Sequence, residues 1–285
     1  MGFNDILLKL FGRRGVFFFR YVTVRKRLPN FNNPTNLSEI IMSRILSNKT
    51  VEFADYADKI KVRDYVRQKG LESILLTHYH YWDSADEIDL SELPEKFVLK
   101  TNKGEGSHDV VICRDKSAFD LASAKAKLSK ALTRKYKYDF QYNHISPRII
   151  CEELIDTGDG SQPTDYKFLC IHGEPVSIFV ASDRKENGDV CFCSKSISWQ
   201  PLNDIRKEFL PAHDIEKPKH LDEMVQIARV LSADFDLVRV DLYEYRDQVY
   251  FGELTFSPGG GQFMYSMEAV EKYGRMYNEG KSKKK

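Results

Sequence analysis

The sequence predicts an α+β fold, in which helices and strands occupy separate stretches of the chain. Apolar residues before residue 70 recur mainly with helical spacing, whereas those after residue 96 largely alternate with polar residues at a period of two. Helix and strand signals do not alternate regularly, which argues against a doubly wound parallel sheet. With 285 residues, the chain can bury a large core in one large domain or two small ones.

The predicted elements follow one another in a simple order. Helices are expected at residues 35–46 and 54–68, within a mainly helical N-terminal third. Strands at residues 96–101 and 109–113 flank a glycine-containing loop, and a long amphipathic helix is expected at residues 116–135. A strand-rich half follows, with strands at 148–154, 166–171, 175–181 and 190–193, a helix at 221–231 and a final hairpin.

Composition and charge exclude some classes of function. The net charge of +1 disfavours wholesale nucleic-acid binding, because a general polyanion binder is expected to be more basic. The five cysteines are odd in number and have no zinc-type spacing, which is typical of reduced thiols in the cytoplasm.

The first 30 residues alternate short apolar runs with basic residues. The apolar runs at residues 6–11 and 16–19 are too short to span a bilayer, and the charges within and after them do not fit a signal peptide. One interpretation is a basic amphipathic segment that rests on anionic lipid. The other, which we favour, is a helix that packs on the domain with its basic side in water.

The C-terminal hairpin is predicted by two runs of period-two alternation. Residues 239–243 and 250–255 flank a short polar turn, which we expect to be centred on Asp247. In that register, the apolar residues of both strands share one face and therefore point to the core. The charged residues share the other face.

This hairpin places two carboxylates opposite each other. Asp241 faces Glu253, and Arg239 faces Thr255. Like charges directly opposed in a sheet are destabilising, and paired carboxylates suit Mg²⁺, a hard cation that prefers oxygen ligands. A solvated face with screened charges is the alternative for an arbitrary acidic pair.

Three further segments each have two interpretations, one as part of a binding site and one as ordinary structure. The loop at residues 101–108 offers backbone N–H groups to phosphate oxygens, or is an ordinary hairpin turn. It lacks the ending and the following helix of a P-loop. Residues 151–155 follow an apolar strand and form either a purine-binding hinge or an exposed strand end. Residues 165–167 begin a strand whose charged face is either inward or solvated.

The order of these features resembles the ATP-grasp superfamily, and more closely its TupA-like family of teichuronopeptide and surface-polysaccharide biosynthesis. The motifs that carry the resemblance lie at residues 33–34, 58–66, 93–102, 165–168, 238–243 and 251–256. The resemblance implies two α+β lobes that grip ATP. It divides the chain into a mainly helical region (1–90), a nucleotide-binding lobe (91–154), a metal and acceptor lobe (155–278) and a disordered basic tail (279–285).

The resemblance also implies nucleotide-binding residues. Lys100 would bind the α/β phosphates of ATP, and Lys61 would be a further phosphate contact. The lid loop would contribute Asn102, Gly104, Gly106 and Ser107, and the adenine hinge Glu152, Glu153, Leu154 and Ile155. The loop departs from the family pattern at Lys103, where histidine is expected, and at Glu105, where a small residue is expected.

The same resemblance implies metal ligands and catalytic residues in the second lobe. Asp241, Glu253 and Thr255 would hold Mg²⁺, and threonine in place of the more usual asparagine leaves open whether one or two ions bind. Arg239 and Lys167 would act at the acceptor carboxylate and the transferring phosphoryl group.

The implied activity is an ATP- and Mg²⁺-dependent carboxylate–amine ligation through an acyl phosphate. The expected substrates are a uronic acid or other carboxylate of a bacterial surface polysaccharide, such as a capsule, and an amino acid or amine. An ATP-dependent phosphotransferase acting on a sugar and a non-catalytic nucleotide-binding scaffold are the alternatives. The expected location is the cytoplasm, with peripheral contact at the inner membrane face or with a lipid-linked glycan.

Overall fold

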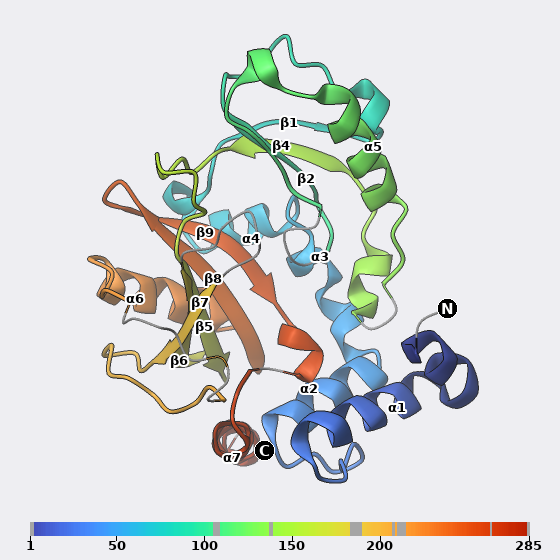
Figure 1. The fold of residues 1–285 in the computed structure, drawn as a ribbon. Helices are drawn as coiled ribbons and strands as arrows, with labels where there is room; N and C mark the ends of the chain where they lie inside the picture. The colour runs from blue at the N-terminus through green and yellow to red at the C-terminus, as the bar shows by residue number, and fades with distance from the viewer. Residues whose placement is uncertain are drawn as a thin grey trace.

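Two antiparallel sheets organise the strands of the chain, and helices pack around them (Figure 1). The computed structural model describes residues 3–104, 109–136, 139–182, 190–206, 209, 215–262 and 264–283, with side chains from residue 8 to residue 282. Both sheets are antiparallel and the helices do not alternate regularly with the strands, so the predicted α+β class is confirmed.

The N-terminal region is mainly helical, as predicted, but its second predicted helix is divided. The helices are α1 (Phe3–Arg25), α2 (Leu37–Leu46), α3 (Ala54–Ala57) and α4 (Val62–Gln68), with short 3-10 turns at Lys49–Phe53, Glu72–Ile74 and Ala85–Glu87. The break between α3 and α4 has a local cause. The Asp58 carboxylate accepts a hydrogen bond from the Ile60 N–H, and the Lys59 N–H donates to the Asn102 carbonyl instead of to a helical partner.

The first sheet has four strands in the order β1-β4-β2-β3. They are β1 (His78–Trp82), β2 (Phe97–Thr101), β3 (Val111–Cys113) and β4 (Ile149–Glu153). Because β1 pairs with β4, the sheet takes its edge strand from before residue 91. Helix α5 (Leu121–Leu132) covers one face, where Leu128 packs in the same core cluster as Leu99 and Cys151. It is shorter than predicted because a 3-10 turn at Lys116–Ala118 precedes it and Asp120 caps its start.

The second sheet has five strands in the order β7-β6-β5-β8-β9. They are β5 (Asp165–Ile171), β6 (Glu174–Ser182), β7 (Cys191–Lys195), β8 (Leu237–Tyr245) and β9 (Gln248–Thr255). Helix α6 (Leu221–Ser232) covers one face and packs with Phe168 and Val240. The other face is divided. At one end Leu169, Ile171 and Leu237 lie beneath α2 and α7 (Met267–Lys283), whereas the other end carries charged side chains.

The expectation of a disordered tail at residues 279–285 differs from the structure, in which α7 continues to Lys283. The expectation rested on the basic composition alone. Tertiary contacts hold the helix instead: the Tyr277 hydroxyl donates to Asp236 at 2.7 Å, and Gly280 packs directly on the His172 ring. Residues 284 and 285 lie outside the described residues.

The β8–β9 hairpin has the predicted register at its charged end. Asp241 pairs with Glu253, and Arg239 pairs with Thr255. The apolar residues of both strands lie in the core on the opposite face. The like-charged pair predicted from the alternation is therefore present in the folded chain.

The predicted turn of this hairpin is wrong by one residue, and a bulge compensates for the difference. The turn has two central residues, Arg246 and Asp247, with φ of 47° and 65°, rather than a centre on Asp247. The pairing then shifts between Asp241 and Leu242, next to Gly252. A Cβ at Gly252 would lie 2.9 Å from Cε2 of Tyr243 and 3.0 Å from the Asp241 carbonyl oxygen, so the bulge favours glycine.

We expect Gly252→Ala to lower the free energy of unfolding by about 1–3 kcal/mol, because the added methyl group forces the two strands apart. Urea unfolding at neutral pH measures this change. Gln248→Ala, at the exposed start of the same strand, is the control and should change stability by less than about 1 kcal/mol. Equal effects of the two substitutions would contradict the packing argument.

Candidate active site

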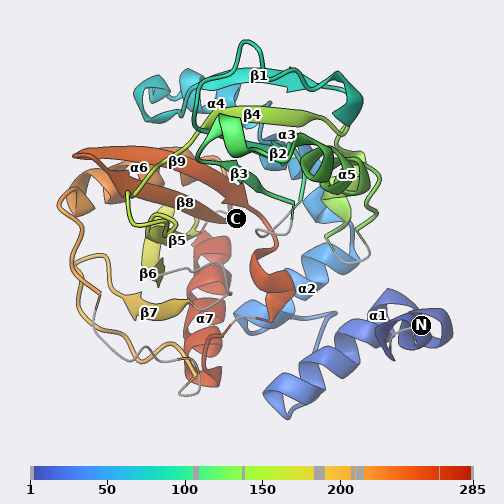
Figure 2. The same ribbon diagram turned by 45° about the horizontal axis from the view of Figure 1, so that its top comes forward.

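A cavity of about 440 Å³ lies between the two sheets. The face of the first sheet that α5 leaves uncovered forms one wall, and the charged end of the second sheet forms the other. Figure 2 shows the two sheets facing each other across this region. The lining includes the apolar side chains of Leu76, Val98, Ile112, Ile155 and Phe251, and apolar lining with a few polar groups is typical of small-molecule sites.

On the first sheet, Lys100 and Glu152 form a buried ion pair that lines the cavity. Both side chains point to the same face, because Val98, two residues before Lys100, pairs with Glu152. Burial raises the pKa of Glu152, but the Lys100 ammonium and a hydrogen bond from His78 outweigh it and lower the pKa to about 2. The pair therefore presents a fixed cation to the cavity.

The lowered pKa of Glu152 predicts a pH dependence of stability. Its ordinary value is 4.5, so the carboxylate contributes about 3 kcal/mol above pH 4.5, and this contribution is lost as the pH falls toward 2. We expect the free energy of unfolding of Glu152→Gln to fall less than that of wild type as the pH is lowered from 4.5 to 2. Urea titrations of wild type, Glu152→Gln and the control Glu153→Gln measure it. If Glu152→Gln leaves the acid profile unchanged, the ion pair does not contribute in this way.

The loop after β2 is held by its own side chains. Asn102 donates from Nδ2 to Asp58 and to the Ser146 carbonyl, both at 3.0 Å, and its Oδ1 accepts from the Arg148 N–H at 2.8 Å. These three bonds tie the Asn102 side chain to the neighbouring segments, and Asn102 does not line the cavity. Gly104 has φ of 101° and abuts Tyr136, and Gly106 and Ser107 lie outside the described residues.

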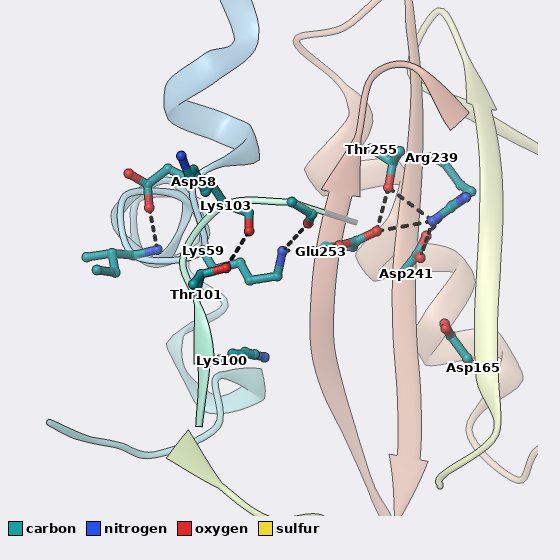
Figure 3. Close-up of polar contacts among 12 residues, drawn as sticks. Asp58, Lys59, Lys100, Thr101, Lys103, Asp165, Arg239, Asp241, Glu253 and Thr255 are labelled. Atoms are coloured by element: carbon teal, nitrogen blue, oxygen red, sulfur yellow. Dashed lines mark hydrogen bonds and ion pairs between the residues drawn. The ribbon is translucent and has the colours of Figure 1, made fainter. Parts of the chain in front are cut away.

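Lys59, and not Lys61, is the lysine of the 58–66 motif that lines the cavity. Lys61 is 58% exposed and pairs with Asp55 at 2.7 Å, away from the cavity. Lys59 donates to the Gly104 carbonyl at 2.9 Å and lies 3.7 Å from Glu253 across the cleft (Figure 3). The break between α3 and α4 decides which lysine points inward, and it depends on the distant Asn102, so spacing within the motif could not reveal it.

On the second sheet, Arg239 bridges the predicted metal ligands (Figure 3). Its guanidinium donates to both Asp241 oxygens at 2.6 Å, to Glu253 at 3.2 Å and to the Thr255 hydroxyl at 3.1 Å. Burial lowers the pKa of Arg239, but Asp241 and Glu253 outweigh this effect and raise it. In the folded protein, the positive charge between Asp241 and Glu253 is therefore the guanidinium of Arg239.

Lys167 completes this charged wall from the neighbouring strand β5. It pairs with Asp241 in the sheet register, and its Nζ donates to Asp241 at 2.6 Å and to Asp165. Burial raises the pKa of Asp241, but Arg239 and Lys167 outweigh it and keep the pKa low. Asp165, whose direction the sequence left open, points inward, and burial raises its pKa.

The chemistry of these side chains fits a cation that is shared with a ligand. Asp241, Glu253 and Thr255 offer hard oxygen atoms, and Oδ1 of Asp165 is buried with no hydrogen-bond partner in the described part of the chain. In that same part, no three His, Cys, Asp or Glu side chains gather closely enough to hold a metal ion alone. Mg²⁺ commonly takes one or two carboxylates plus phosphates and water, which matches this donor set.

Most of the residues predicted for the site meet at this cavity. Those lining it are Lys100, Glu152, Glu153, Leu154, Ile155, Lys167, Arg239, Asp241, Glu253 and Thr255. Lys61, Asn102 and Gly104 do not line it. Lys59, Asp165 and His78 also line it and were not predicted as site residues, although Lys59 and Asp165 lie in the motifs at residues 58–66 and 165–168.

The cavity between the two antiparallel sheets thus collects lysines, an arginine and carboxylates from both walls. The chain belongs to the TupA-like ATP-grasp family, whose family model matches residues 39–275. The resemblance seen in the sequence is therefore confirmed.

Among solved structures, the chain is similar to several ligases at low identity. D-alanine–D-alanine ligase from Bacillus anthracis is 15% identical with a TM-score of 0.44, over 78% of this chain and 63% of the ligase. L-amino acid ligase from Bacillus licheniformis is 18% identical with a TM-score of 0.46, over 89% of this chain and 57% of the ligase. D-cycloserine synthetase DcsG is 15% identical with a TM-score of 0.46, over 79% of this chain and 70% of the synthetase. A comparison with curated proteins found no match.

Proposed function

We propose that the protein is an ATP- and Mg²⁺-dependent carboxylate–amine ligase. The γ-phosphoryl group of ATP passes to a carboxylate oxygen and gives an acyl phosphate and ADP. The amine then attacks the acyl carbon, the C–O bond to phosphate breaks, and the products are an amide, phosphate and one proton. The observation that carries the proposal is the convergence of Lys59 and Lys100 with Arg239 and Asp241 on one cavity.

The residue types support phosphoryl transfer by positioning and charge neutralisation. Such a transfer requires fixed cations around the phosphates and no protein nucleophile. Lys59 and Lys100 would bind the phosphates from the first wall. Arg239 and Lys167 would turn from Asp241 to the transferring phosphoryl group and the acceptor carboxylate.

Mg²⁺ would be held by Asp241 and Glu253, with Thr255 as a weaker third ligand. When bound, the ion would neutralise charge on the phosphates. Arg239 forms ion pairs with both Asp241 and Glu253 in the structure. Mg²⁺ would take the place of Arg239 beside these carboxylates, and the nucleotide phosphates would become the new partners of Arg239. The adenine ring would occupy the apolar part of the cavity, with the backbone of residues 152–155 at its edge.

The family supports a proposal for the substrates. We assign the carboxylate to a uronic acid of a bacterial surface polysaccharide, such as a capsule, and the amine to an amino acid. The reaction would take place in the cytoplasm, at the face of the membrane where lipid-linked glycans are extended. Cationic residues around the cavity are suited to a carboxylate acceptor of this kind.

The proposal is tested with a uronic acid labelled with ¹⁸O in its carboxylate. We expect one ¹⁸O atom to pass to inorganic phosphate for each amide formed, and product release that depends on the amine. Hydroxylamine in place of the amine should trap a hydroxamate. A stable phosphorylated sugar formed without amine would indicate a phosphotransferase instead. Nucleotide binding without turnover across a panel of uronic acids and amino acids would indicate a scaffold.

A further inference from the structure

Helix α1 is kinked at Gly12, and the part that follows the kink packs on the rest of the protein through one face. On that face Phe17 and Tyr21 are fully buried. The buried guanidinium of Arg25 donates to the Tyr265 carbonyl at 2.6 Å and to the Ser38 hydroxyl at 2.9 Å. Figures 1 and 2 both show α1 at the edge of the molecule, at the end remote from β1. Because this face is anchored to the protein, the opposite face points to solvent.

Uncovered aromatic side chains lie on the opposite face of this part and on the segment before the kink. Phe11, Phe18 and Phe19 are 56%, 37% and 39% exposed, and Leu10 and Leu28 at the flanks are 68% and 76% exposed. The rings of Phe11 and Phe18 each lie within 6 Å of the Phe19 ring, at 5.7 and 5.8 Å. Five of the ten strongly exposed large hydrophobic residues in the described part of the chain thus lie in one short segment. Scattered exposed apolar residues are ordinary, but a cluster of aromatic rings marks an interaction surface.

The charge of this segment is as unusual as its aromatic content. Residues 6–38 contain seven lysines or arginines and no acidic residue, although the whole chain has a net charge of only +1. Lys9, Arg14, Lys26 and Arg27 are exposed; Arg27 also pairs with Glu271 at 2.8 Å, and Arg14 donates to Asn32 at 2.9 Å. The surface therefore combines apolar anchors with positive charge.

We propose that the outer face of α1 binds the surface of an anionic lipid bilayer. Aromatic rings enter the boundary between headgroups and acyl chains, while lysine and arginine contact negatively charged headgroups. A second copy of the chain is a poorer occupant, because a twofold contact would oppose two basic surfaces. Within the described residues, none of the helices has the length and apolar character needed to cross a bilayer, so the contact is interfacial.

The experiment compares vesicle binding by two matched double variants. Phe18→Ser/Phe19→Ser removes two rings that are 37% and 39% exposed, and Ile197→Ser/Val230→Ser removes two side chains that are each 39% exposed elsewhere. Wild type and both variants are sedimented with vesicles of phosphatidylcholine alone or of phosphatidylcholine with phosphatidylglycerol. Circular dichroism and sedimentation velocity report the folding and the oligomeric state of each protein.

We expect wild type and the Ile197/Val230 variant to bind the phosphatidylglycerol vesicles, and the Phe18/Phe19 variant to bind about tenfold or more weakly while still folded. Added salt should weaken wild-type binding. Equal binding by the two variants, absence of binding by wild type, or equal binding to both kinds of vesicle would overturn the proposal. So would self-association of wild type that the Phe18/Phe19 substitutions abolish.

This inference is independent of the proposed reaction. Phe18 and Phe19 do not line the cavity, so nucleotide turnover without vesicles should be the same in wild type and in the Phe18/Phe19 variant. A charge variant, Lys9→Gln/Lys26→Gln, provides a second check that keeps every aromatic ring. It should also reduce binding to phosphatidylglycerol vesicles, and unchanged binding would remove the electrostatic part of the proposal.

Discussion

Asp241→Asn is expected to reduce ATP turnover by a factor of about 100 to 1,000. Asparagine keeps the size of the side chain but removes the charge that attracts Mg²⁺ and orients Arg239 and Lys167. Release of ADP, measured with saturating MgATP, carboxylate and amine, reports the effect. A higher Mg²⁺ requirement in the variant would indicate that the loss comes from metal binding.

The same substitution should also destabilise the fold. Asp241 is 1% exposed, and loss of its charge leaves the partly buried Arg239 and Lys167 with too few carboxylates, which typically costs about 3–5 kcal/mol. Urea unfolding at neutral pH measures the cost. Asp55→Asn is the control, since Asp55 is 70% exposed and its partner Lys61 is on the surface. If Asp241→Asn turns over ATP at the wild-type rate, Asp241 is not part of the reaction centre.

Lys100→Met is expected to weaken ATP binding and to reduce turnover by about 100-fold or more, because the cation at the end of β2 is lost. The substitution also leaves Glu152 buried without its principal partner. Calorimetric titration with a non-hydrolysable ATP analogue separates binding from turnover. Lys61→Met is the matched control, and its position on the surface predicts wild-type binding.

A second substitution separates the role of Lys100 in binding from its role in stability. In Lys100→Met/Glu152→Gln, the uncompensated carboxylate is removed together with the lysine, so stability should recover in part. Nucleotide binding should remain weak. Recovery of both properties would show that Lys100 acts only by balancing the charge of Glu152.

Much of the second sheet could be predicted because its signals are local. The alternation in β8 and β9 places Asp241 and Glu253 on one face, and the observed register confirms it. The prediction of the turn failed by one residue, yet the register survived because the bulge next to Gly252 adds the missing residue. Strand β1 was not predicted, since His78–Trp82 is largely exposed and its pairing with β4 joins segments about 70 residues apart.

Backbone periodicity was sufficient to group the charged residues, because side chains in a strand alternate between two faces. Periodicity carries no information about what covers each face. Packing of α2 and α7 over Leu169 and Leu237 decided that only the far end of this face opens to the cavity. The bond from the Lys59 N–H to Asn102 likewise decided which lysine reaches the cavity. These choices depend on contacts between distant segments, and such contacts exist only once the chain has folded.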